Sequence, residues 1–104
     1  MMNPRIAADY HELGAWLAGF ARSHAKREDG RIEVFLDDAG PREGQSFGVR
    51  LRLGGRVELP LEAPPLEFTA AEVAEGRTRF AWCAALAERL RTVARALSDA
   101  RAVG

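Results

Sequence analysis

The spacing of apolar residues changes twice along this chain, from a helical period to a strand period and back. Over about residues 4–28 apolar residues recur at steps of three and four, which is typical of an amphipathic helix. Over residues 31–61 they alternate with polar residues, as in half-buried antiparallel strands. From about residue 70 to 100 the helical spacing returns. Two amphipathic helices and a sheet with one apolar face bury these residues when both helices cover that face.

The first predicted helix has a clear start and a clear end. Asn3 is suited to cap the first N–H groups, and Pro4 to the first helical position, where its missing N–H is not needed. The apolar stripe is Ile6, Tyr10, Leu13, Trp16, Leu17, Phe20 and His24. Asp29 and Gly30 are expected to end the helix, with Gly30 in the left-handed conformation.

Three strands are predicted between the helices, joined as a meander. Their inward residues are Ile32, Val34 and Leu36, then Phe47, Val49, Leu51 and Leu53, then Val57, Leu59 and Leu61. Because directly opposed residues lie on one face, we expect either a three-residue connection, Gly54 to Arg56, or a bulge there, so that Leu53 lies opposite Val57. Pro60, Pro64 and Pro65 are expected to end the sheet.

The last helix is predicted as one continuous segment from about residue 70 to 100. Thr69 and Glu72 form a capping box, and Phe68 and Val73 occupy the positions of a hydrophobic staple. Its apolar stripe is Val73, Gly76, Phe80, Cys83, Leu86, Leu90, Val93 and Leu97. The predicted fold is a two-layer α+β sandwich with an N-terminal helix, a three-stranded antiparallel meander and a long C-terminal helix. The 104 residues are expected to form a single domain over residues 1–104.

The length of this last helix predicts a homodimer. It would extend roughly 45 Å, whereas strands of this length reach only about 23 Å. Its overhanging apolar stripe needs a cover. The first helix could pair with it over its full length, but a partner chain is favoured, and a symmetric second copy is the commonest partner. The candidate interface is Trp16, Phe20, Leu86, Leu90, Val93 and Leu97. The first strand is a second possible interface, because residues 31–37 contain no Pro or Lys to block edge pairing.

The outward sheet face offers an alternative, weak binding of nucleic acid. Arginines beside an aromatic ring on an open sheet are a known way of gripping single strands. The candidate residues are Arg31, Phe35, Arg50, Arg52 and Arg56. Against this, Glu33, Asp37 and Glu58 lie on the same face, and fifteen basic residues balance fifteen acidic ones. A solvated face of paired charges is therefore favoured over nucleic-acid binding.

The sequence offers little for catalysis, and we expect no enzyme, metal or cofactor. His11 and His24 lie about 220° apart around one helix, so they cannot act together. Cys83 falls on the apolar stripe, where a thiol behaves as a small hydrophobe. The acidic residues around the loop at 38–45, Asp37, Asp38 and Glu43, lack the spacing of a ligand loop.

The leading hypothesis is a non-catalytic, self-associating protein-interaction module. A site for a small ligand between the helices and the sheet, lined by Trp16, Phe80 and Trp82, is a further alternative. No apolar run reaches the length of a membrane span, and Asp9, His11 and Glu12 interrupt any signal peptide, so a cytoplasmic protein is expected. Lys26 is the only lysine, a bias typical of GC-rich bacterial genomes.

Overall fold

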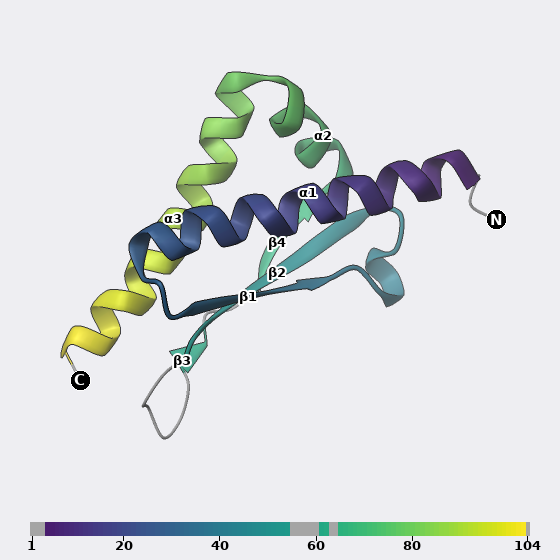
Figure 1. The fold of residues 1–104 in the computed structure, drawn as a ribbon. Coiled ribbons are helices and arrows are strands. Elements are labelled where there is room, and N and C mark those ends of the chain that lie inside the picture. Colours follow the sequence, from purple (N-terminus) through teal and green to yellow (C-terminus); the bar gives the residue numbers. More distant parts are fainter. Residues whose placement is uncertain (1–3, 55–60, 63–64, 104) are drawn as a thin grey trace.

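The computed structural model describes residues 4–54, 61–62 and 65–103 (Figure 1). Helices and strands follow the predicted order, and the α-helices lie on one side of the sheet (Figure 1). The predicted two-layer α+β arrangement is therefore confirmed. In chain order the elements are α1 (Pro4–Glu28), β1 (Ile32–Asp37), the 3-10 helix η1 (Gly40–Arg42), β2 (Ser46–Leu53), β3 (Leu61–Glu62), β4 (Leu66–Thr69), α2 (Ala70–Thr78) and α3 (Phe80–Val103).

Strand β2 is the centre of the sheet. It pairs antiparallel with the whole of β1, from Ile32 opposite Leu53 to Asp37 opposite Gly48. Its other edge is shared, because β3 pairs with the end of β2 and β4 pairs with its beginning. Strand β1 therefore lies at one edge of the sheet.

The predicted turn after β2 is wrong. Leu53 lies opposite Leu61, not opposite Val57, so the connection is longer than three residues. The predicted partner, Val57, and the observed partner, Leu61, are four residues apart in the sequence. Because four is an even number, the same face of the strand is apolar in either register. Residues 55–60, which include Val57 and Leu59, lie outside the described part of the chain.

The sheet also does not end at the prolines. Residues Leu66–Thr69 form β4, which places Phe68 opposite Phe47 and buries both rings completely. Thr69 then caps α2 as predicted, because its hydroxyl accepts a hydrogen bond of 3.0 Å from the backbone N–H of Glu72. One short segment is thus the end of a strand and the start of a helix.

The last helix is broken at Arg79, which the periodicity did not indicate. Arg79 has extended backbone angles, φ −121° and ψ 124°, and separates α2 from α3. The break lets α3 fold back so that Leu86 lies directly over Gly76, where any Cβ atom would collide with the leucine side chain. The single long helix that the dimer argument required therefore does not exist.

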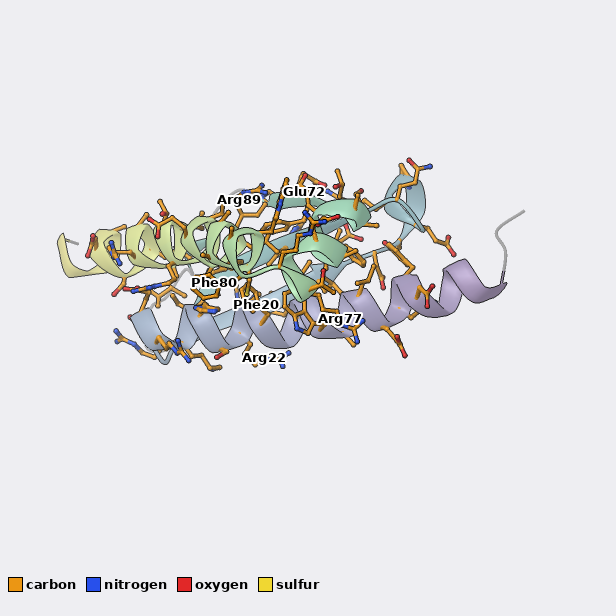
Figure 2. The ribbon with its side chains drawn as sticks, turned by 90° about the horizontal axis from the view of Figure 1, so that it is seen from above. Phe20, Arg22, Glu72, Arg77, Phe80 and Arg89 are labelled. Atoms are coloured by element: carbon orange, nitrogen blue, oxygen red, sulfur yellow. The ribbon has the colours of Figure 1, made fainter. Side chains whose placement is uncertain are left out.

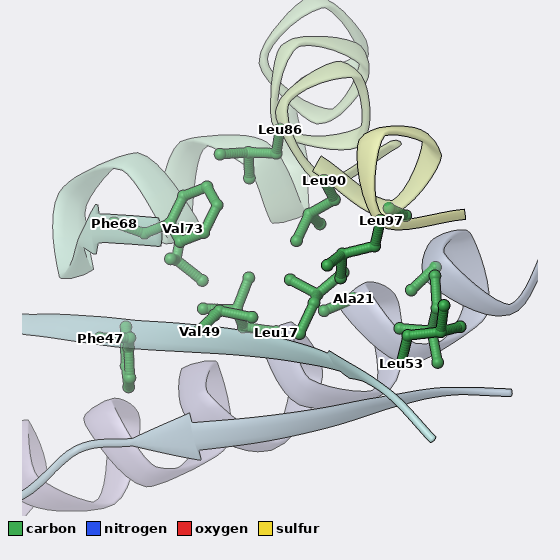
Figure 3. Close-up of a cluster of buried hydrophobic side chains, with 14 of the residues drawn as sticks. Leu17, Ala21, Phe47, Val49, Leu53, Phe68, Val73, Leu86, Leu90 and Leu97 are labelled. Atoms are coloured by element: carbon green, nitrogen blue, oxygen red, sulfur yellow. The ribbon is translucent and has the colours of Figure 1, made fainter. Parts of the chain in front are cut away.

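The core lies between the helices and the inner face of the sheet. Helix α1 approaches the sheet closely at Gly14, where an added Cβ atom would lie 3.0 Å from the ring of Phe47. Figure 3 shows the core side chains converging from α1, β2, β4, α2 and α3. The largest fully buried members are Phe47, Phe68, Leu17, Ile32, Leu51, Leu53, Leu90, Val49 and Val73.

Two local features hold the ends of α1. Gly30 does not adopt a positive φ, contrary to the prediction; among the described glycines only Gly40 (65°) and Gly44 (78°) do. At the C-terminal end of α1 the Asp29 carboxylate instead binds the guanidinium of Arg31. Near the other end, the Tyr10 ring stacks on Phe47 and its hydroxyl donates to the Ser46 carbonyl at 2.5 Å.

Candidate interaction surfaces

The outer face of the sheet carries alternating charges around one exposed aromatic ring. The register of β1 and β2 places Glu33 beside Arg52, and Phe35 beside Arg50. Phe35 is 45% exposed. The guanidinium of Arg52 lies 5.5 Å from the Phe35 ring centroid and 3.4 Å from the Glu33 carboxylate. The ring and the two arginines therefore form one continuous surface.

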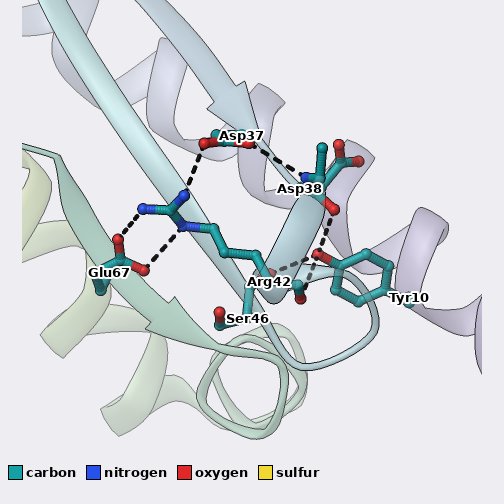
Figure 4. A network of polar contacts seen from close by, with 7 residues as sticks. Tyr10, Asp37, Asp38, Arg42, Ser46 and Glu67 are labelled. Carbon is teal, nitrogen blue, oxygen red and sulfur yellow. Dashed lines mark hydrogen bonds and ion pairs between the residues drawn. The ribbon is translucent and has the colours of Figure 1, made fainter.

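Arg42 neutralises the acidic residues at one end of this face (Figure 4). Its guanidinium lies over Gly48, binds the carboxylate of Glu67 with two nitrogens, and donates to Asp37 at 2.7 Å. The hydrogen bonds from Arg42 lower the pKa of Glu67. Any side chain at position 48 would occupy the space that Arg42 fills. The carboxylates of Glu67 and Asp37 are therefore both paired with Arg42 of the same chain.

A hollow of about 420 Å³ opens beside this network. Its lining combines β1 and β2: Phe35, Leu36, Asp37, Arg50 and Arg52. Within the side chains that the structure describes, Arg50 forms no ion pair, whereas Arg42 and Arg52 do. The hollow therefore has an aromatic wall and a guanidinium group with spare hydrogen-bond donors.

Only part of the predicted nucleic-acid surface is assembled. Phe35, Arg50 and Arg52 come together as the strand alternation predicted. Arg31 instead turns to Asp29, whose carboxylate it contacts at 2.8 Å and 3.0 Å. Arg56 and Glu58 lie outside the described residues. The face that remains alternates in sign and presents no continuous basic track for a phosphate backbone.

The predicted dimer interface is mostly core. Leu86, Leu90 and Leu97 are at most 6% exposed in the single chain, and Val93 packs against the same cluster. They are covered because α3 folds back over α2 and the sheet, which a continuous helix would not allow. These leucines consequently offer no surface to a second copy in this conformation.

The two aromatic members of that predicted interface remain partly accessible. Trp16 and Phe20 are half-buried on α1, and their rings stack with centroids 4.7 Å apart. The His24 ring meets Phe20 edge-on at 4.5 Å, one turn further along the helix. Burial lowers the pKa of His24, and its Nδ1 atom is buried without a partner. The rings of Trp16, Phe20 and His24 therefore pack against one another along α1, and part of the Trp16–Phe20 stack is exposed to solvent.

Two exposed aromatics at the start of α3 were not predicted as surface residues. Phe80 is 89% exposed and Trp82 is 46% exposed, so neither lines a ligand pocket between the helices and the sheet. Figure 2 shows Phe80 and Phe20 on the helical side of the molecule, viewed from above. The sequence stripe assigned Phe80 to the core because it ran through the break at Arg79.

Over residues 4–54, 61–62 and 65–103, the ionisable side chains form no constellation typical of catalysis. His11 is exposed on α1 and Cys83 is half-buried on α3. In the described residues no group of three His, Cys, Asp or Glu side chains is arranged to hold a metal ion. None of the helices there is long and apolar enough to cross a membrane. Comparisons with protein families, with curated proteins and with solved structures find no match.

Proposed function

We propose that this chain is a non-catalytic protein-interaction module that forms a homodimer through its helical side. The exposure of Phe80 carries the proposal. An aromatic ring that is 89% exposed leaves most of its apolar surface in water. Burying such a side chain contributes about 1.5–3 kcal/mol. Large exposed apolar side chains that gather on one side of a protein are typical of interfaces.

Two further aromatics on the helical side, both on α1, support the same surface. Trp82 is 46% exposed as well, but it lies two residues after Phe80, about 200° around α3, and so faces another side of that helix. Trp16 and Phe20 contribute the open side of their stack on α1. Aromatic residues are enriched in protein interfaces, and Trp and Tyr dominate their binding energy. We define Trp16, Phe20 and Phe80 as the aromatic surface.

Charged residues next to the aromatic surface already have partners. Just before Phe80, Arg79 pairs with Glu75 at 2.9 Å and Arg77 with Glu12 at 3.9 Å. Charges that are paired within one chain can stay at the solvated rim of an interface without needing a partner from the second copy. A second copy of the chain is the simplest partner for the aromatic surface, because a two-fold axis brings two identical aromatic surfaces together.

Native mass spectrometry tests the proposal. We expect a species at twice 11.4 kDa for the unmodified chain. The Phe80→Ser variant is expected to lose it, because the variant removes the most exposed ring and leaves the core untouched. Phe35→Ser is the matched control, since it removes an exposed ring from the opposite face of the sheet.

Two results of the mass measurement would contradict the proposed homodimer. A monomer mass for the unmodified chain at every concentration would overturn the proposal. Loss of the dimer in Phe35→Ser but not in Phe80→Ser would also overturn it, by placing the interface on the sheet. Circular dichroism of both variants checks that each retains the helical content of the parent.

A further inference from the structure

Strand β1 presents unpaired backbone groups at the edge of the sheet. The Gly54 N–H donates to the Arg31 carbonyl at 3.1 Å, so these two residues, directly beyond Ile32 and Leu53, occupy the position of a hydrogen-bonded pair in the β1–β2 register. Such pairs alternate along antiparallel strands. Phe35 therefore turns its N–H and carbonyl toward β2, whereas Val34 and Leu36 turn theirs toward the open edge.

The side chains of β1 favour a further strand at this edge. Val34 and Leu36 are only half-buried on the inner face, although both are apolar, and Phe35 is 45% exposed on the outer face. Apolar side chains on both faces of an edge strand gain burial when another strand pairs with it. Nothing in Ile32–Asp37 blocks this pairing, because the strand has no Pro and no Lys.

A second copy of β1 does not fit as that strand. Helix α1 packs over β1, and its Gly14 lies against the Leu36 side chain. Antiparallel pairing of two β1 edges would place the two strands about 4.8 Å apart and both α1 helices on the same face. Packed helices need about 8–10 Å between their axes. The edge is therefore suited to an extended segment that carries no helix of its own.

The hollow on the outer face indicates the chemistry of that segment. A residue paired opposite Phe35 would lie on the outer face, with Phe35 between it and Arg50. Its Cα atom would be about 10 Å from that of Arg50, which an arginine and a glutamate can span together. Arg50 lacks an ion pair among the described side chains, and Asp37 is already bound by Arg42.

From these observations we propose that β1 binds an extended peptide segment of a partner protein by strand addition, with an acidic side chain of the segment in the hollow between Phe35 and Arg50. Main-chain hydrogen bonds to Val34 and Leu36 supply the attachment, and the ion pair with Arg50 selects the sequence. This site lies across the sheet from the helical aromatic surface. It therefore stands whether or not the chain forms a dimer.

Titration of the ¹⁵N-labelled protein with blocked synthetic peptides tests this site. The probe TVTVEVTVT places valines on the inner face and its acidic residue on the outer face, and TVTVKVTVT is its charge-reversed match. We expect the amide signals of Val34 and Leu36 to shift, and the acidic peptide to bind about tenfold more tightly. N-methylation of the two valines beside the central residue removes the N–H groups that face β1 and should abolish binding.

Arg50→Gln should abolish the preference for the acidic peptide, while Arg22→Gln, at an exposed arginine of α1, should retain it. Equal binding of the two peptides, undiminished binding of the N-methylated peptide, or no binding at all would each overturn the proposal. So would binding of oligothymidine, with shifts at Phe35 and Arg50, in place of either peptide. The mass measurement on Phe80→Ser remains a separate result, because it reports only the helical side.

Discussion

Asp29 shows how one residue replaces the glycine cap that the sequence indicated. Its side chain is 8% exposed and accepts hydrogen bonds from the Arg31 guanidinium, the Arg31 backbone N–H and the Ser98 hydroxyl. The guanidinium is the main cause that lowers the Asp29 pKa to about 2. One carboxylate thus ties the end of α1 to the start of β1 and to α3.

This carboxylate makes stability depend on pH. Because the Asp29 pKa is lower in the folded chain than its ordinary 3.8, its contribution is complete above that value and is lost as the pH falls toward about 2. Arg31 is half exposed, so solvent screening limits the contribution to about 1 kcal/mol. We expect Asp29→Asn to lower the free energy of unfolding by this amount at pH 7, and by much less near pH 2.

Urea denaturation at both pH values measures the effect. Asp9→Asn is the control, because Asp9 is exposed on α1 and none of the hydrogen bonds or ion pairs of the described residues includes it. An equal loss of stability in Asp29→Asn at pH 7 and near pH 2 would show that the ion pair is not the cause.

At the scale of elements, the break between α2 and α3 depends on a glycine. Gly76 is buried within α2, and a Cβ atom there would collide with the Leu86 side chain of α3. Alanine normally stabilises a helix interior by up to about 1 kcal/mol relative to glycine. Overpacking a core costs about 1–3 kcal/mol, so the collision outweighs the gain.

Gly76→Ala is therefore expected to destabilise the chain, whereas Gly19→Ala should stabilise it. Gly19 is exposed on α1, and a Cβ atom there meets nothing within 4 Å. The pair of variants separates helix propensity from packing, because each adds one methyl group to a helix. Thermal unfolding monitored by circular dichroism compares them, and a gain of stability in both would show that α3 does not pack on Gly76.

The sequence predicted the elements that are long enough to show a hydrophobic period or that carry a local motif. α1, β1 and β2 follow from periodicity, and the Thr69 cap from its motif. Strand β4 was missed because its four residues are too few for a period, and prolines precede them. The break at Arg79 was missed because the apolar spacing runs through it, whereas the packing of Leu86 on Gly76 that accompanies the break is a tertiary contact.

The candidate surfaces divide in the same way. Phe35, Arg50 and Arg52 could be placed together from strand alternation, which depends only on the pleat. Arg31 could not, because an aspartate two residues earlier captures it. The exposure of Phe80 and the burial of Leu86 both depend on the break, so the interface predicted from one continuous helix included leucines that are buried in the single chain and left out Phe80.

For the whole molecule, dimerisation and stability are linked by mass action. If the folded chain dimerises through the aromatic surface and the unfolded chain does not, the unfolding midpoint rises with protein concentration. We expect such a rise over about a hundredfold range of concentration for the unmodified chain. Phe80→Ser should unfold at a midpoint that does not depend on concentration, because the variant is expected to stay monomeric. It should still fold, because the Phe80 ring is exposed and lies outside the core. A constant midpoint for the unmodified chain would contradict dimerisation through the aromatic surface.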